Sequence, residues 1–279
     1  MKKIFIFITL GVAISACGVF NKGKGINLYS VQQDKELGAQ VAQEIANNPT
    51  EYPVVDSATN VALYAYVYKI RNKILNSGKV THKDDFQWRV QIINNDTVLN
   101  AFCTPGGYIY LYTGIMKYLD SEDELAGVLG HEIAHADLRH STRQMTTMYG
   151  IDVLVSAISG NREALKNITE SLIGLKFSRN HESEADLKSV EYLCPTDYNA
   201  NGGGKFFEKI SATGGGKSIE FLSTHPSPDK RIESYNNKKS ELGCTGNKDY
   251  KKEYANMKSL LNNINSGLKL NGGIKFGKP

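Results

Sequence analysis

The segment His131-Glu132-Ile133-Ala134-His135 concentrates residues that can do chemistry. Two histidines four positions apart lie on one face of an α-helix, about one turn from each other, so both imidazoles can bind one metal ion. The glutamate after the first histidine can take a proton from a water molecule held there. The pattern H-E-x-x-H therefore predicts a zinc site with hydrolytic chemistry, although so short a pattern also occurs by chance.

A catalytic zinc ion needs three protein ligands and an open fourth position. Glu182 is the candidate for the third ligand, and Asp186 lies one helical turn later. One of these carboxylates can bind the metal while the other accepts the second N–H of a histidine ligand and fixes its tautomer. The alternative is a solvated acidic helix face, because Glu184 is close by.

The histidines are expected in the middle of a helix that begins near Ser121. The segment Ser121-Glu122-Asp123-Glu124 resembles a capping box, in which the serine accepts a backbone N–H and Glu124 reaches back to the cap. Acidic residues in the first turn also suit the helix dipole. The apolar face of this helix would consist of Leu125, Val128, Leu129, Ile133 and Ala134.

Hydrophobic periodicity predicts an α+β fold that is mostly helical. Apolar residues at helical spacing predict helices over 30–47, 56–75 and 177–193. Alternating patterns predict three strands over 86–93, 99–103 and 108–113, which would form a small antiparallel sheet beside the histidine helix. Residues 143–176 hold mixed helical patterns and are equally compatible with a core helix and with a mobile flap over the cleft.

The N-terminus has the anatomy of an export signal. A basic start is followed by an apolar run over 4–14, which is short for a membrane span, and then by small residues before Cys17. The small residues before Cys17 resemble a bacterial lipobox, which implies cleavage before Cys17 and lipid attachment to it. The alternatives are an ordinary signal peptide or an uncleaved anchor. The residue after Cys17 is Gly18 and not an aspartate, which resembles the sorting signal of lipoproteins sent to the outer membrane.

Export would place the remaining cysteines in an oxidising compartment. Cys103, Cys194 and Cys244 allow three single disulfides. The pair Cys194–Cys244 is favoured because both cysteines lie beside loops rich in proline or glycine, and Cys103 would then be a free, packed residue.

The composition excludes some classes of protein. The chain has 279 residues, of which 41% are hydrophobic and 22% charged, so it is not a disordered protein. The net charge of +4 is mild for this length, and no basic stripe with interleaved aromatic residues is present, which argues against nucleic acid as a partner.

Four stretches together resemble one protein family. They are Asn100–Ile109, Leu129–His135, Asn180–Asp186, and His225-Pro226 followed by Arg231-Ile232. The chain resembles the gluzincin zinc metallopeptidases of the CAAX-prenyl-protease/HtpX-like family, and is most similar to the BepA-like periplasmic lipoprotein branch. The resemblance runs from about Asp34 to Tyr235. The multi-helix membrane body of the prenyl proteases is missing, which argues against prenylated substrates.

The resemblance implies a zincin-like peptidase domain and assigns roles to its residues. His131, His135 and Glu182 would bind one Zn²⁺ per chain, Glu132 would be the general base, and Asp186 would orient a ligand. His225 would be an oxyanion donor, a reversible fourth ligand or a structural loop residue. Arg231 would donate to the oxyanion or pair with Glu182 or Asp186. His140, His181 and His82 are expected at the surface.

The strand over 108–112 offers a candidate for substrate binding. As an exposed edge it would pair with an extended peptide, with Tyr108, Tyr110 and Asn100 as the contact residues. The alternating tyrosines are equally compatible with the core and surface of a sheet.

The implied function is zinc-dependent endopeptidase activity. Its polypeptide substrates would be misfolded or misassembled envelope proteins. The alternative is a chaperone-like assembly factor with little or latent proteolysis. We expect a signal peptide over 1–16, a tether over 17–29, a peptidase domain over 30–245 and a helical or disordered tail over 246–279. The chain would be anchored to a bacterial membrane, the outer one, through its lipid and would face the periplasm.

Overall fold

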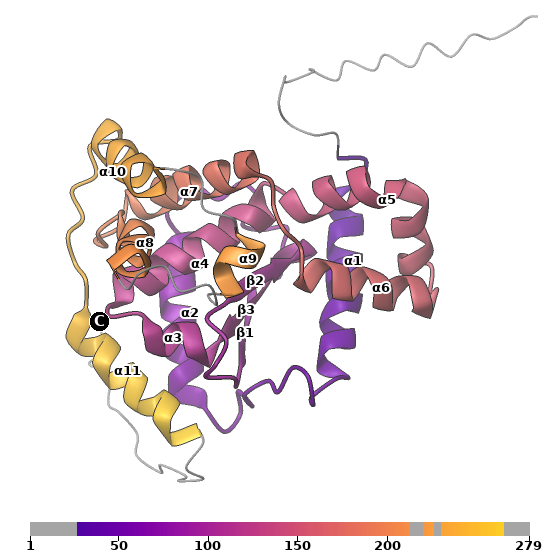
Figure 1. Cartoon of the computed structure of the whole chain (residues 1–279), viewed down its shortest axis with the longest axis horizontal. Coiled ribbons are helices and arrows are strands. Elements are labelled where there is room, and N and C mark those ends of the chain that lie inside the picture. Colours follow the sequence, from indigo (N-terminus) through magenta and orange to yellow (C-terminus); the bar gives the residue numbers. More distant parts are fainter. Residues whose placement is uncertain (1–26, 213–219, 226–229, 265–279) are drawn as a thin grey trace, which may run out of the picture.

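The computed structural model describes residues 27–212, 220–225 and 230–264. Helices surround one small sheet (Figure 1). In chain order the elements are α1 (Val31–Ala46), α2 (Val61–Leu75), β1 (Arg89–Ile93), β2 (Ala101–Thr104), a 3₁₀ turn (Pro105–Gly107), β3 (Tyr108–Tyr112), α3 (Thr113–Tyr118), α4 (Glu122–Asp137), α5 (His140–Ile158), α6 (Arg162–Ile173), α7 (Arg179–Leu193), α8 (Gly202–Ala212), α9 (Glu220–Thr224), α10 (Arg231–Glu241) and α11 (Lys251–Ile264). The predicted α+β class, mostly helical with a small sheet, is confirmed.

The sheet is mixed, so the prediction of an antiparallel sheet is wrong for one of its pairs. The strand order is β1-β3-β2, with β2 antiparallel and β1 parallel to β3. After β1 the chain forms β2 two strand positions away, which leaves one position open between them. The tight turn at Pro105–Gly107 then reverses the chain, and β3 fills that middle position, antiparallel to β2 and parallel to β1. Gly106 and Gly107 have φ of 74° and 83°, values that favour glycine.

Helix α4 is the centre of the fold, and every one of its residues is buried. It packs against β2 on one side and against α7 and α8 on the others. Gly127 allows α8 to come close, because a Cβ at this position would lie 2.1 Å from the backbone nitrogen of Gly203. A helix enclosed on all sides holds its side chains in fixed positions, which a metal site requires.

The start of α4 is where the sequence predicted it, but the capping contacts differ. The Ser121 hydroxyl donates to the side chains of Asp123 and Glu124 and accepts no backbone N–H of the helix. The backbone N–H groups of Glu122 and Asp123 instead point at the carbonyl of Asp249, at 2.9 and 3.4 Å. A distant loop therefore satisfies the first turn, which local sequence cannot reveal.

Two groups of buried apolar residues hold the elements together. The larger group joins the sheet, α2, α4, α7, α8 and α11. The smaller one lies between α1 and the α5–α6 hairpin and includes Leu37, Val41, Leu154, Ile168 and Leu172. The hairpin, at the right in Figure 1, is therefore packed on α1 through its own apolar face.

A disulfide joins the ends of two helices that carry site residues. It links Cys194, directly after α7, to Cys244, shortly after α10. This is the pairing that the sequence favoured. Cys103 is free and buried in β2, as expected of a packed residue.

None of the helices in the described part of the chain is long and apolar enough to cross a membrane. The predicted signal peptide, Cys17 and Pro226 lie outside the described residues. Helix α11, in the predicted tail, packs on the core through Tyr254, Met257 and Leu261.

Candidate metal centre

His131 and His135 lie in the second half of α4 and are 2% and 0% exposed. Their Nε2 atoms approach each other to 3.0 Å, because the spacing of four residues places both rings on one face of the helix. Phe177 stacks on the ring of His135 with 4.0 Å between ring centroids, which fixes the plane of that ring. Both rings thus present a nitrogen to the same point.

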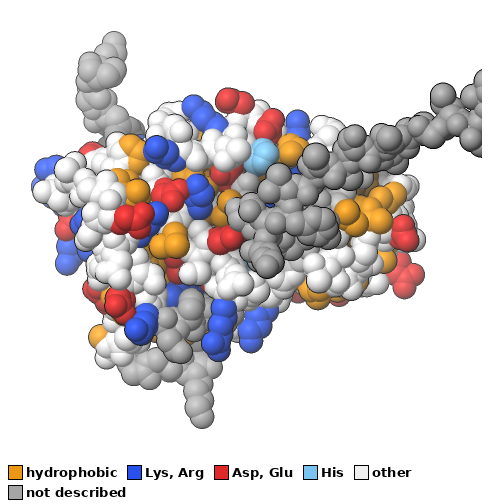
Figure 2. Space-filling model, turned by 90° about the horizontal axis from the view of Figure 1, so that it is seen from above, with side chains coloured by type: hydrophobic (Ala, Val, Ile, Leu, Met, Phe, Trp, Pro, Cys, Tyr) orange, Lys and Arg blue, Asp and Glu red, His pale blue; other side chains and the backbone are white. Residues whose placement is uncertain are grey.

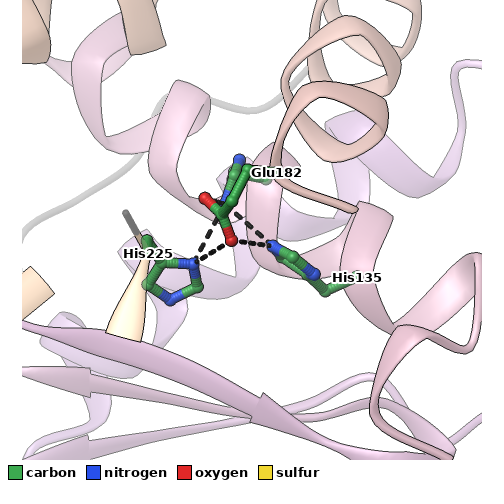
Figure 3. A group of neighbouring side chains, drawn as sticks. His135, Glu182 and His225 are labelled. Atoms are coloured by element: carbon green, nitrogen blue, oxygen red, sulfur yellow. Dashed lines mark hydrogen bonds and ion pairs between the residues drawn. The ribbon is translucent and has the colours of Figure 1, made fainter. Parts of the chain in front are cut away.

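Glu182, in the first turn of α7, supplies a carboxylate to that point. Its Oε1 lies 3.3 Å from Nε2 of His135, and its Oε2 lies 3.5 Å from Nε2 of His131. Figure 3 shows the carboxylate between the rings of His135 and His225. Burial alone would raise the pKa of Glu182, but the surrounding histidines, His225 foremost, hold it below its ordinary value. Glu182 is therefore a buried anion.

His225 belongs to the same cluster. Its Nδ1 lies 3.1 Å from Oε1 of Glu182 and 3.3 Å from Nε2 of His131, and its side chain is 1% exposed. The ring of Phe221 stacks on it with 4.4 Å between centroids. One ligand atom from each of the four residues falls within 4.8 Å of the others. Of the three predicted roles, this position matches that of a fourth ligand.

Glu132 points into the same space from α4. It is 0% exposed, and neither carboxylate oxygen accepts a hydrogen bond from an N–H or O–H group within the described residues. Its Oε1 lies 3.6 Å from Nε2 of His225. Burial raises the pKa of Glu132 above the ordinary glutamate value, against the opposing effects of His225 and His131. A buried carboxyl group with a raised pKa is suited to accept a proton and release it again.

Asp186 and Arg231 form a buried pair behind the ligands. The guanidinium of Arg231 donates to both carboxylate oxygens of Asp186, at 2.7 and 2.5 Å, and Tyr235 donates to Oδ1 at 2.8 Å. Oδ1 also lies 2.9 Å from Nδ1 of His131, and the third Arg231 nitrogen, Nη1, lies 3.3 Å from Oε2 of Glu182. Of the roles predicted for Arg231, the structure shows the pairing with both acids.

The donor set fits Zn²⁺. Zinc ligands lie about 2.0–2.1 Å from the ion in a tetrahedron, which requires ligand atoms roughly 3.3 Å apart. Four of the distances between the donor atoms, taken with Oε1 of Glu182, range from 3.0 to 3.3 Å, and all four atoms lie within 4.8 Å of one another. Two or three imidazoles and one carboxylate are also ligands that zinc prefers. His131, His135 and Glu182 would hold the ion, and His225 lies at the fourth position.

A family model described as Peptidase family M48 matches residues 62–239, which is more than half of the chain. The chain belongs to peptidase family M48. The predicted family and the metallopeptidase class of this M48 chain are thereby confirmed.

Several curated proteins are similar to this M48 chain. Metalloprotease YcaL of Escherichia coli K12 is 33% identical over 143 residues, or 48% of this chain and 56% of that protein. Mitochondrial metalloendopeptidase OMA1 of Schizosaccharomyces pombe is 31% identical over 173 residues, or 60% and 50%. The beta-barrel assembly-enhancing protease of Escherichia coli K12 is 28% identical over 167 residues, or 54% and 34%. The chain therefore matches about half the length of these relatives, or less.

His140 is a site residue that the sequence did not reveal. It was expected at the surface, but it is 0% exposed and its Nδ1 lies 3.0 Å from Nδ1 of His135. Burial lowers the pKa of His140 to about 3. The reason is the chain reversal after α4: Arg139 adopts a left-handed conformation with φ of 59°, and α5 begins with His140 directed back at the site. Helical spacing from His135 cannot predict a residue beyond such a turn.

The substrate role predicted for Tyr108 and Tyr110 does not fit this M48 fold. β3 is the central strand, paired on both sides, so it cannot serve as an edge. The two tyrosines are 8% and 1% exposed and belong to the core. The edge beside α4 is β2. Asn100 directly precedes β2 and is 4% exposed, with its Oδ1 3.5 Å from the Thr224 hydroxyl.

Cys103 faces the centre without the properties of a nucleophile. Burial raises its pKa well above the ordinary cysteine value, and the neighbouring Glu132 carboxylate raises it further. A thiol held protonated in this way is a poor nucleophile. The chemistry of the site therefore rests on the histidines and acids.

Proposed function

We propose that the chain is a zinc-dependent endopeptidase that cleaves misfolded or misassembled envelope proteins. The observation that carries this proposal is the position of Glu132, which is buried and accepts no hydrogen bond from an N–H or O–H group of the described residues, beside the cluster of His131, His135 and Glu182. A purely structural acid at this place would be a costly arrangement, because buried polar groups normally have hydrogen-bond partners. The substrate class is supported by the name of one relative, the beta-barrel assembly-enhancing protease.

The residues of the chain divide the chemistry between them. Zinc in such a site polarises the scissile carbonyl and makes water acidic enough to lose a proton near neutral pH. Glu132 accepts that proton, and its raised pKa allows it to pass the proton on to the leaving amine. The Asp186 carboxylate lies 2.9 Å from Nδ1 of His131 and so holds the other nitrogen of the ring toward the metal position.

The substrate backbone would align along β2. This strand is an edge of the sheet and packs on α4, the helix that carries Glu132. The residues of β2 are 0–4% exposed, so an extended peptide would add to this edge once the segments that cover it have moved aside. Main-chain hydrogen bonds of this kind give little side-chain preference. That property suits a peptidase for unfolded chains.

The second candidate is a chaperone-like factor with latent proteolysis. The observation in its favour is His225, whose Nδ1 lies among the ligand atoms where a water or substrate would otherwise bind. The endopeptidase and the chaperone-like factor would have the same site. They would differ only in the fraction of molecules whose fourth coordination position is open.

Metal removal tests the proposed function. The purified chain should contain about one zinc per molecule and should cleave casein or an unfolded outer-membrane protein. A chelator should abolish cleavage, and added zinc should restore it. Cleavage that continues in a metal-free sample would contradict the proposal. Substrate binding without any cleavage, by zinc-loaded protein, would favour the second candidate.

His225→Ala is expected to raise the rate of cleavage several-fold. The imidazole competes for the fourth position, and the apparent activity of a protein falls with the fraction of molecules that are competent. Initial rates on casein at matched zinc content measure the effect. A lower kcat in the variant would instead assign His225 to the oxyanion, and an unchanged rate would exclude both roles.

We further propose that the chain is lipid-anchored at Cys17 and faces the periplasm, in the outer membrane, with the domain boundaries given above. The support is the lipobox-like sequence before Cys17. Radioactive palmitate should label the wild-type chain and not Cys17→Ser, and the variant should leave the membrane fraction. Label on the Cys17→Ser chain would contradict the lipid anchor at Cys17.

A further inference from the structure

The two histidine ligands differ in what their second ring nitrogens contact. Nδ1 of His131 faces the Asp186 carboxylate at 2.9 Å. Nδ1 of His135 faces another imidazole, that of His140, at 3.0 Å. The other nitrogen of His140, Nε2, lies 3.1 Å from Oε2 of Glu184. We propose that His140 and Glu184 are positioning residues for His135, acting as a hydrogen-bond relay from the surface to the metal. The inference rests on the zinc site proposed above.

The chemistry of imidazole allows this relay to run in only one direction. His135 can bind a metal through Nε2 only if its single ring hydrogen is on Nδ1. Nδ1 of His135 therefore donates to Nδ1 of His140, which must be the acceptor. The hydrogen of His140 must then be on Nε2, from which it donates to Glu184. A carboxylate has no hydrogen to donate, so Glu184 fixes the tautomers of both rings.

Packing holds the relay in place. The ring of His140 is stacked on that of His181 at 4.3 Å with 15° between the planes. Glu184 is on α7, two residues after the ligand Glu182, and Arg143 of α5 lies 3.9 Å from its Oε2. The Glu184 side chain is 33% exposed, whereas His140 is 0% exposed. The relay therefore links α4, α5 and α7 at the metal.

The expected effect concerns metal affinity. Loss of an outer partner of a ligand histidine typically weakens metal binding by about 10–100-fold. His140→Leu, which fills the space but accepts no hydrogen bond, should show a loss of this size. His140→Asn should recover part of it, because its amide oxygen can accept from His135. Glu184→Gln should show a smaller loss, since its amide oxygen can still accept from His140 but carries no charge.

The test is a chelator competition that measures the zinc dissociation constant of the purified full chain. Glu191→Gln is the matched control, because Glu191 is also on α7, is 28% exposed and is paired with Lys188 and Lys238. It should bind zinc as the wild type does. Far-ultraviolet circular dichroism establishes that each variant is folded, and Glu184→Gln provides a test that removes no buried group.

A second measurement reads the tautomer directly. In the zinc-loaded chain, ¹H–¹⁵N correlation of the histidine rings should show His140 with hydrogen on Nε2 and none on Nδ1. Hydrogen on Nδ1 of His140, or equal zinc affinity in wild type, His140→Leu and Glu184→Gln, would overturn the relay. A wild-type chain that binds no zinc would instead contradict the proposed function, so the two failures are distinguishable.

Discussion

Replacing Glu132 with glutamine is expected to lower the rate of peptide cleavage by about 10²–10⁴-fold while zinc binding is retained. The amide has almost the shape of the carboxyl group but cannot accept a proton at neutral pH. Glu132 contributes to the site as an uncommitted base, since no N–H or O–H group of the described residues donates to it. The substitution should therefore lower kcat and have little effect on the fold.

The measurement is kcat for casein cleavage at equal zinc content, with a melting curve for each sample. The wild-type chain in chelator gives the background rate. Glu132→Gln is expected to melt at the wild-type temperature or above it, because the substitution removes a buried carboxyl group that has a raised pKa. Cleavage at the wild-type rate by Glu132→Gln would remove Glu132 from the mechanism.

Asp186→Ala is expected to lower the free energy of unfolding by about 3–5 kcal/mol, the usual cost of leaving one member of a buried ion pair alone. Arg231 is 3% exposed and donates to both carboxylate oxygens of Asp186, so the alanine variant leaves its guanidinium with Glu182 as the nearest acid. Burial alone would raise the pKa of Asp186, but Arg231 and His131 hold it below its ordinary value, so the carboxylate is charged at neutral pH.

Urea denaturation of the metal-free chain measures this loss without a contribution from zinc. Asp197→Asn is the control, because Asp197 pairs with Lys73 near the surface and should cost at most about 1 kcal/mol. Asp186→Leu combined with Arg231→Met replaces both charges and should recover much of the loss. A fall of less than about 1 kcal/mol in Asp186→Ala would mean that the pair does not hold α7 to α10.

The parts of the site that the sequence predicted are those with a local signal. His131 and His135 share one helix, and Glu182 and Asp186 share another, so periodicity places each pair on one face. A strong pattern in the sequence thus predicts which residues meet within an element. It does not predict how the elements approach one another.

The predictions from sequence failed where the chain reverses or where distant segments meet. His140 enters the site because Arg139 turns the chain back after α4. The carbonyl of Asp249 reaches the first turn of α4 across more than a hundred residues. β3 lies between β1 and β2, although the strands follow one another in the order β1, β2, β3. These arrangements depend on tertiary packing, which a single sequence does not display.

The Cys194–Cys244 disulfide also restricts the unfolded chain. A disulfide acts largely on the unfolded chain, by limiting the conformations open to it. Asp186 and Arg231 are 45 residues apart in the sequence, and the path between them through the bridge is roughly half as long. An unfolded molecule therefore keeps the two halves of its buried ion pair within short reach. Refolding of the site would then begin from an ensemble already biased toward the contact that orients His131.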